Sequence, residues 1–356
     1  MAPVVAPWSG MAHPRSTPTR PGALVLASPA ALVAGIPYLL GFAPRDSAVL
    51  LWLSDGQVVL TQRLDLPAFG DIDAWAAAVW THAGARESDE VIAAFVDPLS
   101  AVGPVADRLI ADTRTRGLRL RDLLEVREGR WRSLLCDDPG CCDPAGQPVD
   151  VAVSDAVAAE FAVLGVAPLP TREDLVASLS ADDSAAGRVA LLLGAGRPSG
   201  ADAEAWRDRA IAEVLAVLAG SAVQPASDAD MAGLLEGLVD VRVRDTVLWE
   251  LMELPQPGLH AALAALVPIV RAAPPGLVAP AATCAAICAW LVGDGARARI
   301  ALDRALADNP DYTMAALVDG ALRGGLPPSE WRAAMSGLTR SDCRHGQRDW
   351  RQAARA

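Results

Sequence analysis

The chain has 356 residues, of which 52% are hydrophobic, and it carries a formal net charge of −12 at neutral pH. All 31 basic residues are Arg, so the chain has no Lys for Schiff-base catalysis or for a Lys-containing phosphate-binding loop. The acidic balance argues against nucleic-acid binding over the surface as a whole, because such binding depends on Lys and Arg displacing counterions from phosphates.

The length favours two domains over a single core. Residues 1–22 are rich in Pro and are predicted to be a disordered leader. They contain no charged segment followed by an apolar one, so we expect no signal peptide. The apolar stretch at residues 272–293 contains Pro and much Ala, which fits a buried helix better than a membrane span. We therefore predict a cytoplasmic protein that does not bind membranes.

In the first half of the chain, helical and strand patterns alternate. Ser28 is placed to cap the first helix, with Pro29 in its first turn. Asp55-Gly56 and Glu128-Gly129 are turn signals typical of hairpins. The expected helices cover residues 29–40, 71–85 and 101–116, and the expected strands cover 48–53, 57–64, 91–96, 118–126 and 130–135. This order predicts an α/β domain over residues 23–150, a mixed sheet with two hairpins and flanking helices.

The second half of the chain shows helical spacing without a convincing strand. We expect a helical connector over residues 151–200, an all-α domain over 201–338 and a basic tail over 339–356. One stretch, residues 290–310, resembles the tetratricopeptide pattern, in which small residues let paired helices approach and a Pro ends the second helix. A single unit does not establish an array, so we predict tetratricopeptide-like helix pairs. The expected helices cover residues 154–164, 202–219, 228–240, 242–253, 258–272, 277–292, 295–307, 312–323 and 328–337, and a capping-box pattern at 171–174 opens one more.

Five polar residues form the first candidate site. Arg45, Asp46 and Ser47 precede the first strand, and Arg63 and Asp65 end its partner strand. Antiparallel pairing brings these two strand ends together. Arg offers a fork for a carboxylate or phosphate, so this corner is a candidate binding site for a small anionic ligand, in an enzyme or a sensor. The alternative is structural: the carboxylates pair with the Arg residues and Ser47 bonds to local backbone.

Three cysteines form the second candidate site. Cys136, Cys141 and Cys142 lie within seven residues, but tetrahedral zinc needs a fourth ligand and the sequence does not identify one. A redox role with a reversible disulfide is a second interpretation. Ordinary buried thiols are the third, and they are the default in a cytoplasmic protein. We predict no cofactor.

The order of these motifs resembles an actinobacterial family, the domain of unknown function 4192. The family often has Pro directly after the double Cys, whereas Asp143 precedes Pro144 here. The resemblance implies an α/β layer followed by helices in a cytoplasmic actinobacterial protein, and it implies no catalytic residues because the family has no established activity. It spans roughly residues 24–331 and rests on residues 36–47, 63–67, 130–133, Cys136, Cys141, Cys142, Gly146, residues 171–175, Arg244, Asp245, Trp249 and residues 293–310.

The sequence contains no complete catalytic constellation; none of its His residues lies near a nucleophile motif such as G-x-S-x-G. The leading hypothesis is therefore a non-enzymatic protein-binding, ligand-binding or adaptor protein. Its helical domain would contact a partner protein or peptide, because helix-pair modules commonly bind partners.

Overall fold

The computed structural model describes residues 3–5, 25–67, 71–81, 88–139, 142–194, 198, 201–220 and 227–346. The chain divides into two compact units. The first, here called the α/β unit, comprises Met1–Leu175 with Arg323–Pro327, and the second, the helical unit, comprises Val176–Leu322 with Pro328–Ala356.

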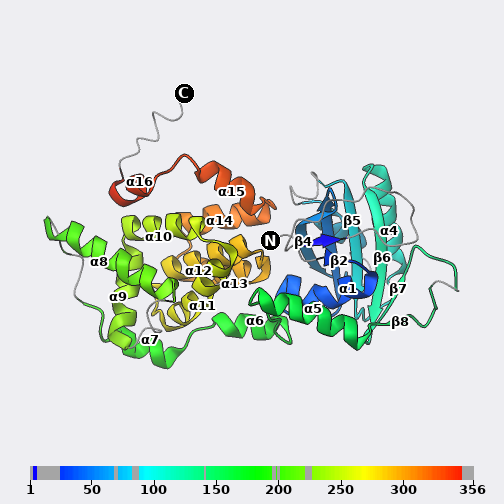
Figure 1. Ribbon diagram of the computed structural model, residues 1–356, viewed down its shortest axis with the longest axis horizontal. Coiled ribbons are helices and arrows are strands. Elements are labelled where there is room, and N and C mark those ends of the chain that lie inside the picture. The colour runs from blue at the N-terminus through cyan, green and yellow to red at the C-terminus, as the bar shows by residue number, and fades with distance from the viewer. Residues whose placement is uncertain are drawn as a thin grey trace. The chain divides into compact units, whose positions relative to one another are not determined.

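A mixed eight-stranded sheet forms the α/β unit, with the strand order β2-β1-β4-β3-β5-β6-β7-β8 (Figure 1). The pairs β1–β2 and β5–β6 are parallel, and the other neighbours are antiparallel. The β3–β4 and β6–β7 pairs are the two hairpins predicted from the sequence. The strands are β1 (Val4–Val5), β2 (Val25–Leu26), β3 (Ser47–Ser54), β4 (Gln57–Asp65), β5 (Glu90–Val96), β6 (Arg119–Arg127), β7 (Arg130–Ser133) and β8 (Gln147–Pro148).

Helices pack against this sheet through buried apolar residues. Leu50 and Trp52 of β3, which share one face because side chains alternate along a strand, lie in a cluster with α2 and α4. Helix α1 packs against β2, β4 and β7 and against α5, where the rings of Tyr38 and Phe161 stack with centroids 4.6 Å apart. The helices are α1 (Pro29–Leu40), α2 (Ile72–Val79), α4 (Gly103–Thr115) and α5 (Val151–Val163).

Helix α1 has the predicted boundaries. The Ser28 hydroxyl accepts a hydrogen bond from the Ala31 amide at 3.1 Å, which satisfies one of the amides that a helix start leaves unpaired. Pro37 lies inside the helix without ending it, and the helix ends at Gly41, which adopts the left-handed conformation with φ 76°. Glycine tolerates this conformation because it has no Cβ.

The predicted leader contains a short strand, so the expectation of disorder was wrong for its first residues. Val4 and Val5 are buried and form β1 between β2 and β4. The Val5 carbonyl accepts a hydrogen bond from the buried Arg121 guanidinium at 3.1 Å. Two Val residues gain burial and ladder hydrogen bonds beside β4, which local composition cannot reveal. The rest of the predicted leader lies outside the described residues.

The helical unit is built around α12. Every residue from Val278 to Leu291 is buried, and α12 packs against α9, α10, α11 and α13. A helix that is apolar all round belongs in a core, as predicted for this stretch. Helix α6 (Arg172–Leu179) spans the boundary between the units, and the unit contains α7 (Asp183–Ala190), α8 (Ala201–Leu218), α9 (Asp228–Val239), α10 (Val241–Glu253), α11 (Gln256–Ala272), α12 (Val278–Val292), α13 (Gly295–Asp308), α14 (Thr313–Arg323), α15 (Pro328–Met335) and α16 (Arg340–His345).

Two helices of this unit were not predicted. Helix α7 is short and polar, and its apolar face is limited to a few residues such as Val189. Helix α16 lies in the predicted basic tail, where Arg344 is buried and donates hydrogen bonds to Glu204 at 2.7 Å and to Asp208 at 2.8 Å. The first part of this tail is therefore folded, because carboxylates distant in sequence pair with its Arg. Residues 347–356 lie outside the described residues.

Candidate functional site

The predicted corner begins where α1 ends. Its backbone is fixed by residues far along the chain: the Ala43 amide donates to the Leu169 carbonyl at 3.0 Å, and the Leu169 amide donates to the Gly41 carbonyl at 2.9 Å. The chain then enters β3 at Ser47, which is fully buried. This pairing holds the turn that carries Arg45, Asp46 and Ser47 against the segment that follows α5.

The two strand ends meet as predicted, because Ser47 lies opposite Asp65 in the β3–β4 register. The Arg63 Nε donates to the Ser47 hydroxyl at 2.9 Å, and the Arg63 Nη2 pairs with Asp65 at 2.5 Å. The Ser47 hydroxyl donates in turn to the Arg45 carbonyl at 2.6 Å. The side chains of Ser47, Arg63 and Asp65 are therefore linked to one another.

Asp46 connects the corner to the loop after β5. It adopts the left-handed conformation with φ 44°, which is uncommon for a residue other than glycine but tolerated by Asp. Its carboxylate accepts from the Leu99 amide at 3.0 Å, its amide donates to the Asp97 carbonyl at 3.3 Å, and its carbonyl accepts from the Leu66 amide at 3.0 Å. These bonds give Asp46 a structural role in joining three segments.

This arrangement leaves little capacity for binding an anion. Recognition of a carboxylate or phosphate by Arg uses its forked donors, and two donors of Arg63 already bond within the chain. Arg45 is exposed, and its carbonyl rather than its guanidinium makes the bond to Ser47. The geometry thus favours the structural interpretation for Arg63, Asp65, Ser47 and Asp46, while the ligand role of Arg45 stays a prediction.

The structure describes only part of the cysteine cluster. Cys136 and Cys142 are half-buried, and the Cys142 amide donates to the Asp138 carbonyl at 2.7 Å. Cys141 lies outside the described residues. Among those that are described, no group of three or more His, Cys, Asp or Glu residues is arranged to hold a metal ion. The redox and zinc interpretations of Cys136, Cys141 and Cys142 therefore stay predictions.

A pair of cysteines in the helical unit is placed for packing. Cys284 and Cys288 lie one turn apart on α12, and both are fully buried. Burial raises the pKa of the Cys284 thiol to about 12, and burial also raises the pKa of Cys288. Since the thiolate is the reactive form, both thiols are expected to be inert in the folded protein.

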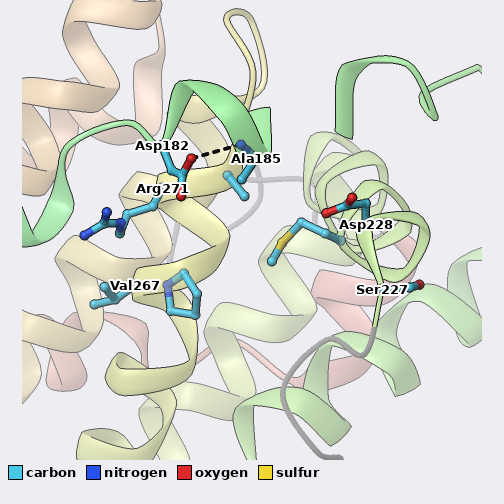
Figure 2. A pocket seen from close by; sticks show the side chains of 9 residues that line it. Asp182, Ala185, Ser227, Asp228, Val267 and Arg271 are labelled. Atoms are coloured by element: carbon cyan, nitrogen blue, oxygen red, sulfur yellow. Dashed lines mark hydrogen bonds between the residues drawn. The ribbon is translucent and has the colours of Figure 1, made fainter. Parts of the chain in front are cut away.

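The sequence did not reveal a pocket that lies between α7, α9 and α11. It has a volume of about 460 Å³ and opens to solvent. Figure 2 shows Asp182 and Ala185 at the start of α7, Asp228 at the start of α9 and Arg271 near the end of α11. The lining residues are Asp182, Ala185, Ser227, Asp228, Met231, Val267, Pro268, Arg271 and Ala272.

Two capping residues, Asp182 and Ser227, line this pocket. The Asp182 carboxylate caps α7 by accepting from the Ala185 amide at 2.9 Å. The Ser227 hydroxyl caps α9 by accepting from the Asp230 amide at 3.1 Å. These caps explain why two helices begin beside each other here. In the sequence, the Ser227 cap signals the start of a helix, but nothing local indicates that α7 and α11 lie next to it.

The lining of the pocket includes both charged and apolar residues. Asp228 pairs with Arg188 of α7 at 2.8 Å, which links α7 to α9. The apolar lining residues include Met231 of α9 and Val267 and Pro268 of α11. Such a combination suits a ligand with both an apolar and a polar group.

Comparisons with known proteins identify the family. No helix within the described part of the chain is long and apolar enough to cross a membrane. No curated protein and no solved structure matches the chain. The family model described as "Domain of unknown function (DUF4192)" matches residues 29–329, which is most of the chain, and confirms the resemblance seen in the sequence motifs. The chain therefore belongs to the DUF4192 family.

Proposed function

We propose that this protein is a non-enzymatic binding or adaptor protein whose helical unit holds a segment of a partner protein or peptide. The observation that carries the proposal is the open pocket of about 460 Å³ between α7, α9 and α11. Ligand-binding pockets commonly range from about 300 to 1,000 Å³ and combine apolar walls with a few polar groups. A cavity of this size accommodates one or two side chains of a partner.

The three helices that form the pocket are anchored in the core of the helical unit. Their inner faces carry fully or almost fully buried residues: Val189 on α7, Leu235 and Leu238 on α9, and Leu266 and Ile269 on α11. A partner therefore meets a surface that is already formed, which reduces the entropy lost on binding.

Tetratricopeptide-like helix pairing belongs to this proposal. Its support is that α12 and α13 are consecutive helices packed side by side, joined by Gly293 with φ 91°. Stacked helix pairs often bind partners along their exposed surfaces. The cytoplasmic location and the actinobacterial source stay predictions from the sequence.

The test uses a substitution whose larger side chain fills the pocket. Ala185 lines it and is half-buried, whereas Ala190 lies on the same helix, is exposed and does not line it. Tagged full-length protein, Ala185→Phe and Ala190→Phe are used to capture proteins from a lysate of the native host, followed by mass spectrometry. We expect a set of proteins captured by the wild type and by Ala190→Phe and lost with Ala185→Phe.

Two results would contradict the proposal. One is capture of the same proteins by an Ala185→Phe variant whose circular dichroism matches the wild type. The other is capture of nothing beyond a tag-only control by the wild type. The alternative function, binding of a small anionic ligand at Arg45 and Arg63, has less support because Arg63 already bonds to Ser47 and Asp65.

A further inference from the structure

The charged residues that line the pocket differ in their bonding. The Asp182 carboxylate bonds to the Ala185 amide, and the Asp228 carboxylate pairs with Arg188. Within the part of the chain that the structure describes, the Arg271 side chain has no hydrogen bond or ion pair, although it is only partly exposed. Among the charged lining residues, Arg271 is thus the one whose side chain has no hydrogen bond or ion pair with the described part of the chain, while Asp182 keeps its negative charge nearby.

A second guanidinium, that of Arg304, is close enough to Arg271 to repel it. Arg304 of α13 is half-buried and donates a hydrogen bond to the Leu179 carbonyl. Burial lowers the pKa of Arg304, and repulsion from Arg271 lowers it further, whereas Asp308 and Asp183 raise it. The Asp308 carboxylate already accepts from two amides at the start of α12. An anion bound at Arg271 would relieve the repulsion between the two cations.

The helix starts at this pocket carry capping side chains and acidic residues. Helix N-termini often bind anions through unpaired amides, but here the Asp182 and Ser227 side chains each occupy one amide, of α7 and of α9 respectively. Asp228 adds negative charge at the start of α9. The group that recognises an anion here is therefore the Arg271 side chain.

We infer that the pocket takes a peptide segment in which an apolar side chain lies next to a carboxylate. The apolar side chain packs on Met231, Val267 and Pro268, and the carboxylate pairs with Arg271. Pro268 lines the pocket without contributing an amide donor, which suits an apolar group. The carboxylate comes from an acidic side chain or from the C-terminus of the partner. This inference rests on the proposed function and specifies the chemistry of its partner.

Three fluorescein-labelled hexapeptides test it by fluorescence anisotropy with the full chain. The first ends in a leucine with a free carboxylate. The second has an internal leucine–glutamate pair and an amidated end, and the third has leucine–glutamine instead. We expect the first or the second to bind at least about tenfold more tightly than the third, since a tenfold ratio corresponds to about 1.4 kcal/mol. The two carboxylate peptides distinguish the C-terminal from the side-chain source.

The variant Arg271→Gln is expected to remove this preference, and Arg271→Lys to keep part of it, because Lys retains the charge without the fork. Arg209→Gln on the exposed face of α8 is the control and should bind as the wild type does. Equal binding of all three peptides overturns the inference; if Ala185→Phe then abolishes that binding, the proposed function stands. Binding of none of the peptides, or an unchanged preference in Arg271→Gln, also overturns the inference.

Discussion

The corner of the α/β unit and the pocket of the helical unit differ in the bonding of their Arg side chains. At the corner, Arg63 bonds to Ser47 and Asp65, which lie on adjacent strands. At the pocket, Arg271 lies beside Asp182 but does not pair with it. The Asp182 carboxylate accepts a hydrogen bond from the Ala185 amide. A concentration of charged residues in the sequence therefore does not indicate a binding site unless the tertiary structure leaves a charge without a partner.

The largest effect on stability is expected at the corner, from Ser47→Val. The hydroxyl of Ser47 is buried, donates to Arg45 and accepts from Arg63, so its removal leaves a buried acceptor and a donor unpaired. We expect a loss of about 1–3 kcal/mol in the free energy of unfolding, measured by urea denaturation. The control Ser54→Val, at the other end of β3, should change it by less than about 0.5 kcal/mol. Equal losses of stability in both variants would show that the corner hydrogen bonds contribute no more than the contacts of Ser54.

A smaller loss of stability is expected from Asp46→Ala. The left-handed backbone at this position disfavours Ala by roughly 1 kcal/mol, and the Leu99 amide loses its acceptor. Asp46→Asn should retain most of the stability, because Asn tolerates this conformation and keeps a side-chain acceptor. Thermal denaturation of the two variants measures the difference. If Asn is as destabilising as Ala, the negative charge of Asp46, rather than its backbone conformation or its acceptor oxygen, stabilises the corner.

The smallest effect on the free energy of unfolding is expected from Arg271→Gln. The variant Arg63→Gln provides the comparison. Arg63→Gln should cost about 1 kcal/mol, mostly from its hydrogen bond to Ser47, since the pair with exposed Asp65 contributes little. Arg271→Gln should change stability by less than about 0.5 kcal/mol, because loss of a favourable charge near the end of α11 is offset by less repulsion with Arg304. A larger loss of stability for Arg271→Gln than for Arg63→Gln would contradict this comparison. It would show that Arg271 has a structural role.

Much of the α/β unit was predictable because its signals are local. The Asp55-Gly56 turn determines where β3 ends and β4 begins, and the Ser28 cap determines where α1 begins. Antiparallel pairing then brings Ser47 opposite Asp65, as expected. Strand β1 was missed because two Val residues gain their stability only from β2 and β4, which no local pattern shows.

The helical unit was predictable as a set of helices but not as a site. Apolar spacing indicated most helices, and the Pro-containing, Ala-rich stretch was expected to form the buried α12. Helix α7 was missed because it is short and polar. The pocket depends on this helix, so neither its lining nor the place of Arg271 in it could be predicted from the sequence.

The sequence by itself determined the family, most helix and strand positions and the meeting of two strand ends, because each depends on motifs or on neighbours a few residues apart. Only the tertiary structure decided which charges have partners. Ser47 and Arg63 are 16 residues apart and bond to each other. Asp182, Asp228 and Arg271 lie on or beside three helices whose packing depends on burial of their apolar faces, and that packing leaves the Arg271 side chain without a hydrogen bond or ion pair among the described residues.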